Sequence, residues 1–529
     1  MSKLKELEQL LTNGKISRRD FIARVSALGL MAAVSPALLS TPAKAATPKK
    51  GGRFRMGLAG GSTTDSLDPG TLPDMVPQMA NRQLRNSLVE TNYKSEPIPE
   101  LAESWDSSPD ATKWTFKLRK GVEFHNGKTL DAEDVVWSIN HHRGKDSKSA
   151  AKGIVDPIKD IKADGKDTVV FELTGGNADF PFIMSEYHLS MIPAGTKGAD
   201  LEKGIGTGPY MLVSHEPGVR VFTKRNPNYW KEGRAHFDEI ETIAISDVNA
   251  RTNALKTGQI DAMNRCERKT FHLLKKMSEL KTIVGNGTKH YTVPMITTIK
   301  PYDSNDARLA LKYAVDREQI VKTVLRGLGT VGNDHPIGRN QRYYAADLPQ
   351  RKYDPDKAKF YLKKAGLEGH VFNLHAADAA FGGAVDAAVI YKENAAKAGV
   401  NINVVKEPDD GYWSNVWMKK EWCMCFWSGR VTEDWMFATA YAADAGWNDT
   451  FWKHERFNKL LVEARAELDD AKRRELYFEC QKIVSDEGAT VVPMFAYDLT
   501  ATGKNVMFEN VAADWEMDGM RAPERWWFA

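Results

Sequence analysis

The chain passes from an apolar run to a group of charges in the stretch Glu421-Trp-Cys-Met-Cys-Phe-Trp-Ser-Gly-Arg-Val-Thr-Glu-Asp-Trp435. The run from Glu421 to Trp427 is apolar on both faces and stops at Gly429, which is typical of a strand covered on both sides. Open α/β sheets hold their ligands beyond the carboxyl ends of such strands. The stretch therefore predicts a buried strand of an α/β protein, followed by a loop at a ligand site.

Tryptophans gather around this loop. Half of the fourteen tryptophans of the chain lie in one short region, at positions Trp413, Trp417, Trp422, Trp427, Trp435, Trp447 and Trp452. Aromatic walls with a few fixed charges are typical of a small-molecule cleft. A Trp-rich edge of the hydrophobic core, beside a solvated Glu-Asp pair, would give the same pattern. Both interpretations stay open at this point.

Length and composition describe an ordinary globular protein. The 529 residues are 42% hydrophobic and 27% charged, which leaves room for two or three domains. The formal charge of +3 comes from the first 45 residues, because 66 basic and 67 acidic residues remain without them. A nearly neutral chain of this kind implies no general attraction to nucleic acids or to anionic membranes.

The first 45 residues resemble a twin-arginine export signal. Ser17-Arg-Arg-Asp-Phe-Ile22 precedes a modestly apolar segment that ends at Leu39, and Ala43-Lys-Ala45 supplies small residues for cleavage. A retained membrane anchor is the alternative, but Arg24 and Pro36 make this segment a poor spanning helix. We expect export to the periplasm and a soluble mature chain from residue 46.

Cysteine usage and motif searches argue against metal sites and catalysis. The four cysteines, Cys266, Cys423, Cys425 and Cys480, are too few for a disulfide-dependent fold and too isolated from histidines for a zinc site, so packed thiols are expected. None of the common hydrolase, metalloprotease, phosphate-loop or dinucleotide motifs is present. The sequence predicts no enzyme, no cofactor and no metal site.

Several stretches carry clear strand and turn signals. Gly51–Ala59 alternates as a strand, and Trp114–Phe124 alternates in a way that predicts a hairpin around Lys120-Gly121. His125–Lys128 is a turn, and the residues that follow predict a helix capped by Thr129 or Asp131.

Two helical signals follow later in the chain. A single apolar stripe extends from Asp303 to Gly327, with Asp303 or Ser304 as its cap. Asp354-Pro355 places a capping residue before a first-turn proline, and Gly366 ends that helix.

Four motifs in order resemble the family 5 extracellular solute-binding proteins, the peptide, nickel and opine receptors of ABC importers. The resemblance rests on Leu118–Ser138, on Gly206-Thr-Gly-Pro-Tyr210 with Lys224–Trp230, on Ala307–Gly327, and on Tyr353–Gly366. These motifs cover nearly the whole mature chain. They identify the scaffold and say little about the ligand.

The resemblance implies a two-lobed α/β receptor whose first lobe is discontinuous and carries an inserted subdomain. Mapped onto this chain, the first lobe comprises 46–88, 210–292 and 497–529, the inserted subdomain 89–209, and the second lobe 293–496. Thr288–Ile299 and Val491–Ala496 are strand-like and suit crossings between lobes.

The resemblance also bears on Arg430. In peptide-binding relatives an Asp in the segment that matches Trp427–Asp434 holds the α-ammonium group of the ligand. In the dipeptide-binding pattern it comes three residues after the Trp, where this chain has Arg430, and in the longer-peptide pattern it comes a little later, where Glu433 or Asp434 could serve. Arginine prefers a carboxylate or phosphate. We expect Arg430 to bind an acidic group, with Asp434 or Glu433 orienting it or meeting an amine. An internal Arg430–Asp434 ion pair is the alternative.

The full set of candidate ligand-binding residues includes neighbours of this loop, the first loop of the chain and the first crossing. The candidates are Arg430, Asp434, Glu433, Trp427, Ser428, Trp435, Trp413, Trp417, Trp447, Thr64, Asp65, Arg265, His290 and Tyr291. For any single tryptophan, core packing competes with ligand contact.

The sequence thus predicts a periplasmic receptor that captures a peptide-like, opine-like or other carboxylate-bearing solute and delivers it to an ABC permease. An oligosaccharide or a metal chelate on the same scaffold is the alternative ligand, and a secreted hydrolase is the alternative class. By resemblance alone, we expect a monomer.

Overall fold

The computed structural model describes residues 48–409 and 411–529. The predicted export signal, residues 1–45, lies outside the described residues. The chain divides into two units, Met1–Pro48 and Lys49–Ala529. The helices and strands described here belong to the second unit. No helix among the described residues has the length and apolar character that crossing a membrane requires.

A seven-stranded mixed sheet is assembled from segments far apart in the sequence. The predicted strand near residue 55 is confirmed as β1, whose Phe54, Met56 and Leu58 are fully buried. It pairs in parallel with β10 and β11 at the centre of the sheet. The spatial order is β12 (Leu280–Gly285), β19 (Asp498–Gly503), β11 (Ala262–Met263), β1 (Arg53–Leu58), β10 (Glu239–Ala244), β9 (Arg220–Arg225) and β8 (Tyr210–Glu216).

A second, four-stranded sheet contains the end of the apolar stretch from Glu421 to Trp427. Its order is β14 (Gly329–Val331), β18 (Thr490–Ala496), β13 (His290–Pro294) and β17 (Cys425–Trp427). The predicted buried strand is confirmed in shorter form. Trp422 and Cys423 are buried but make only isolated bridges, to Met295 and His375. The second bridge leads to the parallel pair β15 (Val371–Ala376) and β16 (Asn401–Lys406).

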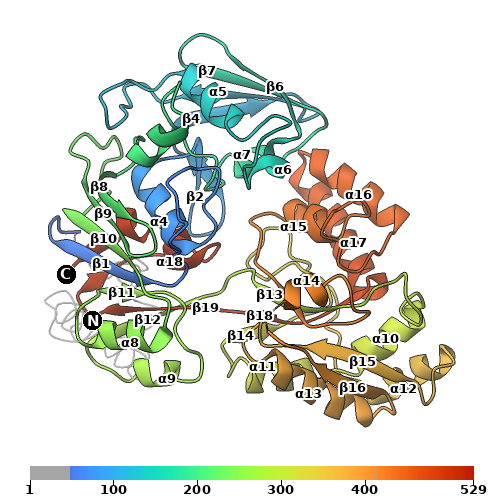
Figure 1. The fold of residues 1–529 in the computed structure, drawn as a ribbon. Coiled ribbons are helices and arrows are strands. Elements are labelled where there is room, and N and C mark those ends of the chain that lie inside the picture. Colours follow the sequence, from blue (N-terminus) through green and yellow to red (C-terminus); the bar gives the residue numbers. More distant parts are fainter. Residues whose placement is uncertain (1–47, 410) are drawn as a thin grey trace, which may run out of the picture. The chain divides into compact units, whose positions relative to one another are not determined.

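The chain passes twice between these two sheets, once between β12 and β13 and once between β18 and β19 (Figure 1). The two passages lie side by side, because the Ala496 N–H donates to the Lys289 carbonyl over 2.9 Å and Lys289 pairs with Asp498 at 3.2 Å. A few residues in each passage connect otherwise separate sheets. They have the arrangement of a hinge.

A four-stranded antiparallel sheet occupies the region of the expected inserted subdomain. Its order is β4 (Ala102–Ser107), β5 (Lys113–Leu118), β7 (Thr168–Leu173) and β6 (Ile158–Ala163). The predicted hairpin around Lys120-Gly121 is wrong, because β5 ends at Leu118 and pairs with β4 and β7. The alternation beyond it places Val122 and Phe124 in the core without a strand. Helix α5 (Ala132–Asn140) begins at Asp131, which forms a capping box with Asp134.

The apolar stripe from Asp303 to Gly327 forms two helices instead of one. α10 (Asn305–Tyr313) is capped by Ser304, and α11 (Arg317–Thr323) starts again at Asp316, whose carboxylate accepts from the Gln319 N–H. A second capping residue inside the stripe is what divides it. Helix α12 (Pro355–Lys364) follows the Asp354 cap as predicted.

The Gly206–Tyr210 motif is explained by close packing against helix α4 (Met75–Leu84). A Cβ at Gly206 would lie 2.2 Å from the Leu84 carbonyl oxygen, and one at Gly208 would lie 2.5 Å from the Gln83 carbonyl oxygen. Only glycine permits this approach. The motif is therefore part of the scaffold.

The four cysteines are free and buried, as expected of packed thiols. Burial raises the pKa of Cys266 to about 12, so this thiol is unreactive.

The remaining helices are α6 (Lys152–Val155), α7 (Phe180–Ile183), α8 (Val248–Lys256), α9 (Phe271–Leu274), α13 (Ala384–Ala396), α14 (Tyr412–Asn415), α15 (Glu433–Ala440), α16 (Glu455–Ala466), α17 (Asp470–Glu487), α18 (Glu516–Gly519) and α19 (Ala522–Arg525). Two further antiparallel strand pairs are β2 (Val89–Thr91) with β3 (Pro97–Pro99), and β20 (Val506–Met507) with β21 (Trp527–Phe528).

Candidate ligand-binding cleft

A cavity of about 1720 Å³ lies beside the two crossing passages. It is large for a small-molecule site, since typical ligand pockets measure about 300–1,000 Å³. Its lining comes from residues within the segments 73–78, 150–157, 174–188, 288–289, 426–447, 458–466 and 514–516, together with Arg265 and Asp498.

The loop between β17 and α15 is fixed at both ends. Thr432 caps α15, its hydroxyl accepting from the Trp435 N–H over 3.3 Å. At the other end Gly429 presses on the first crossing passage, where a Cβ would lie 1.5 Å from the Thr288 hydroxyl oxygen. Only a residue without a side chain fits there. These two constraints position Arg430, which lies between them and lines the cavity.

Among the described residues, the guanidinium of Arg430 has no carboxylate partner. Its guanidinium donates to the carbonyls of Ser428 (2.9 Å) and Gly429 (3.3 Å) and lies 5.7 Å from the centroid of the Trp435 ring. Across residues 48–409 and 411–529 it forms no ion pair within 4 Å. Burial lowers its pKa, although an arginine remains charged at neutral pH. Such a group favours an anionic partner.

The other cations of the cavity wall are already paired. Arg265 pairs with Asp74 at 2.6 Å and with Glu516 at 2.8 Å, Lys289 pairs with Asp498 at 3.2 Å, and Arg465 pairs with Asp434 at 2.9 Å. Among the described residues lining the cleft, Arg430 is therefore the basic side chain still able to receive an anion.

Of the two roles expected for Asp434 and Glu433, orienting Arg430 is wrong, and meeting an amine of the ligand stays a prediction. Asp434 accepts two hydrogen bonds from Arg465 Nε, at 2.9 and 3.0 Å, and Glu433 accepts from the Tyr343 N–H at 2.8 Å. Both acids lie in the first turn of α15 and contact neighbouring segments instead of Arg430. Neither orients Arg430, and the alternative of an internal Arg430–Asp434 ion pair is excluded in this structure.

Six of the fourteen sequence-predicted candidates line the cavity: Arg265, Ser428, Arg430, Asp434, Trp435 and Trp447. Trp447 is 54% exposed, so its ring is free to contact a ligand. The other eight do not line it: Thr64, Asp65, His290, Tyr291, Trp413, Trp417, Trp427 and Glu433.

Four of the eight have structural roles in a strand or a turn. His290 is completely buried on β13, 5.3 Å from the Phe495 ring centroid, and burial lowers its pKa to about 4. Tyr291 stacks on Phe381 with ring centroids 3.9 Å apart. In the first loop, Asp65 closes a turn by accepting from the Ser62 N–H, and the Thr64 hydroxyl hydrogen-bonds with that of Ser62.

Three tryptophans pack on one another, edge to face, instead of on the cavity. Trp417 has its ring centroid 6.0 Å from that of Trp413 and 6.2 Å from that of Trp427. Beneath them Asp449 accepts the indole N–H groups of Trp417 (3.2 Å) and Trp427 (3.3 Å). Burial raises the pKa of Asp449 to about 6. Core packing is therefore the correct interpretation for Trp427, which is 7% exposed, whereas Trp413 is 39% exposed and packs at the surface.

Two sides of the cavity touch at a place that sequence reasoning missed. The Ala178 N–H donates to the Arg465 carbonyl over 2.7 Å, and Asp179 forms an ion pair with Arg473 at 2.8 Å, with both side chains only 4% exposed. Ala178 and Asp179 precede α7, whereas Arg465 and Arg473 belong to α16 and α17. We call these two interactions the closing contact.

The burial of Glu433 predicts that the free energy of unfolding depends on pH. Burial raises its pKa to about 7, and the proximity of Asp179 adds to this. The unfolded chain ionises at the ordinary value near 4.3. The stability contributed by neutral Glu433 is thus complete below that pH and is lost as the pH rises to about 7. Glu433→Gln keeps an acceptor for Tyr343, so we expect the variant to gain up to about 3 kcal/mol over the wild type at pH 8 and little at pH 4.

Urea unfolding at a series of pH values measures this difference. Glu475→Gln, at an exposed position of α17, serves as the matched control and should follow the wild type at every pH. A constant difference between Glu433→Gln and the wild type from pH 4 to pH 8 would show that folding does not raise the pKa of Glu433.

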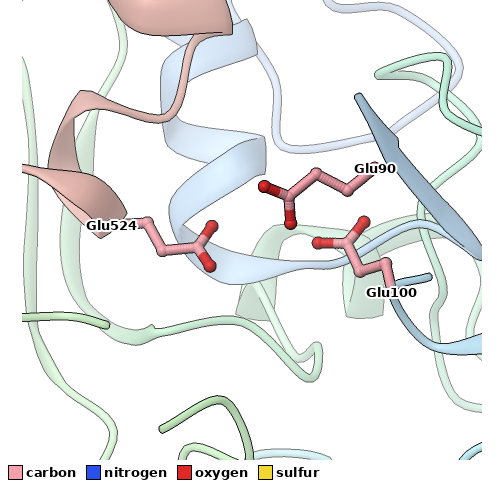
Figure 2. Close-up of side chains that lie close together, drawn as sticks. All are labelled: Glu90, Glu100 and Glu524. Atoms are coloured by element: carbon pink, nitrogen blue, oxygen red, sulfur yellow. The ribbon is translucent and has the colours of Figure 1, made fainter. Parts of the chain in front are cut away.

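One group of acids has the geometry of a metal site but is occupied by side-chain cations. The carboxylates of Glu90, Glu100 and Glu524 point toward one another, with one oxygen of each within 4.8 Å of the others (Figure 2). The Lys231 ammonium lies among them, 3.2 Å from Glu100 and 2.8 Å from Glu524. Arg521 contacts Glu100 at 2.7 Å. We call Glu90, Glu100, Lys231, Arg521, Glu524 and Arg525 the buried charge cluster.

The sheets, helices and cleft define an α/β periplasmic binding protein of the two-lobed type. The fold is shared with HbpA2 from Haemophilus parasuis, at a TM-score of 0.80 and 23% identity, over 90% of this chain and 100% of that one. It is also shared with AgaA from A. tumefaciens R10, solved with agropinic acid, at a TM-score of 0.74 and 23% identity, over 90% of this chain and 99% of that one.

Sequence comparison gives the family. The chain belongs to the bacterial extracellular solute-binding proteins, family 5, whose middle region matches residues 96–449. The dipeptide-binding protein of Escherichia coli K12 is 30% identical over 456 residues, which is 77% of this chain and 83% of the relative. Members of this family are periplasmic solute-binding proteins that work with ABC permeases, and this chain has that substrate-binding role.

Proposed function

We propose that the cleft captures a peptide-like, opine-like or other carboxylate-bearing small solute, and that Arg430 holds its acidic group. The unpaired state of Arg430 carries this proposal. Every other cation of the cavity wall is neutralised by a neighbouring carboxylate, and this one is desolvated beside Trp435. The ligands named for two similar proteins, a dipeptide and agropinic acid, both carry a carboxyl group.

The ammonium site of the dipeptide pattern has no counterpart in this loop. Arg430 stands where the pattern has an Asp, and the two nearest acids of the loop are engaged by Arg465 and by Tyr343. A ligand acid is thus the group that this side of the cleft recognises.

Exposed aromatic rings in the same cleft favour a second candidate. Trp447 is 54% exposed and lines the cavity together with Trp435 and Trp515. Stacking on such rings suits an oligosaccharide or the organic part of a metal chelate. With either ligand, Arg430 would have no essential contact.

Three finer features complete the proposal. The mature chain starts near residue 46 after export by the twin-arginine route, and it acts as a monomer. Its lobes follow the boundaries 46–88, 210–292 and 497–529 for the first, 89–209 for the insertion and 293–496 for the second. The hinge-like passages between the sheets support this division, because the second lies at the 496/497 boundary and the first, residues 286–289, lies just before the 292/293 boundary, which falls within β13.

Native mass spectrometry of the mature protein, purified from its own periplasm, identifies a co-purified ligand. An acidic amino-acid conjugate, an opine or a short peptide supports the proposal. A neutral sugar would favour the second candidate.

Arg430→Ala then tests the residue. We expect the affinity for alanyl-alanine or agropinic acid, whichever the wild type binds, to fall by at least about 100-fold, because a charge-assisted contact in a desolvated site is lost. Isothermal titration calorimetry measures this. Arg456→Ala is the matched control, since Arg456 is an exposed arginine paired with Glu479. Unchanged affinity in Arg430→Ala would contradict the proposed role.

A further inference from the structure

A tyrosine that sequence reasoning missed lines the cavity from another segment than the Arg430 loop. Tyr187 follows α7 and lines the cavity. Its ring is held by His188, with centroids 4.2 Å apart, and by the edge of Trp515, at 5.4 Å. Its backbone carbonyl accepts from Asn81 Nδ2 over 2.8 Å. Both the ring and the backbone of Tyr187 are therefore fixed.

The hydroxyl of Tyr187 is left without a partner. Within the described parts of the chain it makes no hydrogen bond, whereas the buried hydroxyls of Tyr210, Tyr391 and Tyr412 each donate to a carbonyl. A fixed ring with a free hydroxyl on a cavity wall is a polar group available to a ligand.

Tyr187 and Arg430 both line the cavity, Tyr187 from the segment after α7 and Arg430 from the loop after β17. Burial raises the pKa of Tyr187 well above its ordinary value, which keeps the hydroxyl protonated, and Arg430 acts weakly in the opposite direction. The neighbouring acid, Glu186, does not neutralise Arg430 by contact, because its carboxylate is held by His188 at 3.0 Å. At neutral pH, Tyr187 and Arg430 can thus each donate a hydrogen bond to a ligand in the cavity.

We propose that Tyr187 and Arg430 bind the same acidic group of the ligand, from segments on either side of the crossing passages. Arg430 is a charged donor without acceptor capacity, and a group with two or more oxygens can accept from both its guanidinium and the Tyr187 hydroxyl. The ligand class is therefore an oxyanion such as a carboxylate. This inference rests on the proposed function and extends it, since Tyr187 belongs to the segment after α7 and Arg430 to the loop after β17. One acid group would then connect the two sides and couple binding to closure.

Tyr187→Phe tests this inference because it removes one hydroxyl and leaves the ring in place. The probes are alanyl-alanine, its C-terminal amide and agropinic acid, measured by isothermal titration calorimetry up to millimolar concentration. We expect Tyr187→Phe to weaken binding of the acids about 10- to 100-fold, as for a hydrogen bond to a charged group. Binding of the amide should be weak in every variant. Tyr93→Phe, at a tyrosine that is 46% exposed, is the matched control.

A double-mutant cycle separates this inference from the proposed function. If both residues hold one group, the effects of Tyr187→Phe and Arg430→Ala on acid binding should fall short of additive. Full affinity in Tyr187→Phe with loss in Arg430→Ala would overturn the inference and leave the proposed function standing. Full affinity in both single variants, or no binding of either acid by the wild type, would overturn the two together. Thermal unfolding of each variant verifies that it is folded.

Discussion

Arg521→Ala is expected to lower the free energy of unfolding by about 3–5 kcal/mol, because it removes one cation from the buried charge cluster. Arg521 donates to both oxygens of Glu100, at 2.7 and 2.9 Å, and to Glu524 at 2.9 Å. The side chains of all three residues are at most 3% exposed. Without Arg521, Glu100 retains only Lys231 as a cationic partner among residues 48–409 and 411–529, and its charge stays buried.

Urea unfolding of the mature protein measures this loss. Arg53→Ala is the matched control, since Arg53 pairs with Glu239 at 2.8 Å with side chains 49% and 38% exposed, and such pairs contribute at most about 1 kcal/mol. A loss below about 1 kcal/mol in Arg521→Ala would show that water or a rearranged Lys231 compensates for the missing guanidinium.

The fold was predictable where its signals are local. Asp131 and Asp354 precede their helices by one residue and bond to amides three residues away or closer, so sequence spacing alone locates both caps. The same reasoning failed between Asp303 and Gly327, because a continuous apolar stripe outweighed the capping signal at Asp316. The hairpin failed for a related reason, since alternation shows burial and does not show which strand is the partner.

The cleft was predictable only in part, because its contacts join residues distant in sequence. Arg430 was located by its place in the loop, yet the partner of Asp434 is Arg465, on another helix. Asp434 lies four positions after Arg430, a spacing that favours an ion pair on a helix, but α15 begins only at Glu433. Tyr187 carried no sequence signal. Its position depends on contacts with His188 and Trp515.

Asp179→Ala is expected to weaken ligand binding by about 10- to 100-fold, because it breaks the buried ion pair of the closing contact. Loss of a buried pair costs several kcal/mol, and the apparent affinity falls with the fraction of molecules in the closed form. Asp179 pairs with Arg473 where the segment before α7 meets α17, so the cost falls on the closed form. Small-angle X-ray scattering of the ligand-free protein should give a larger radius of gyration than the wild type.

Two controls distinguish the closing contact from a direct ligand contact. Asp160→Ala removes an exposed partner of Lys162 on β6 and should change neither scattering nor affinity. Asp179 lines the cavity, so its loss could also remove a contact to the ligand, but Arg473 does not line it. Arg473→Ala should therefore reproduce both effects of Asp179→Ala. If only Asp179→Ala weakens binding while the radius of gyration of both variants stays unchanged, Asp179 contacts the ligand directly and the ion pair does not govern closure.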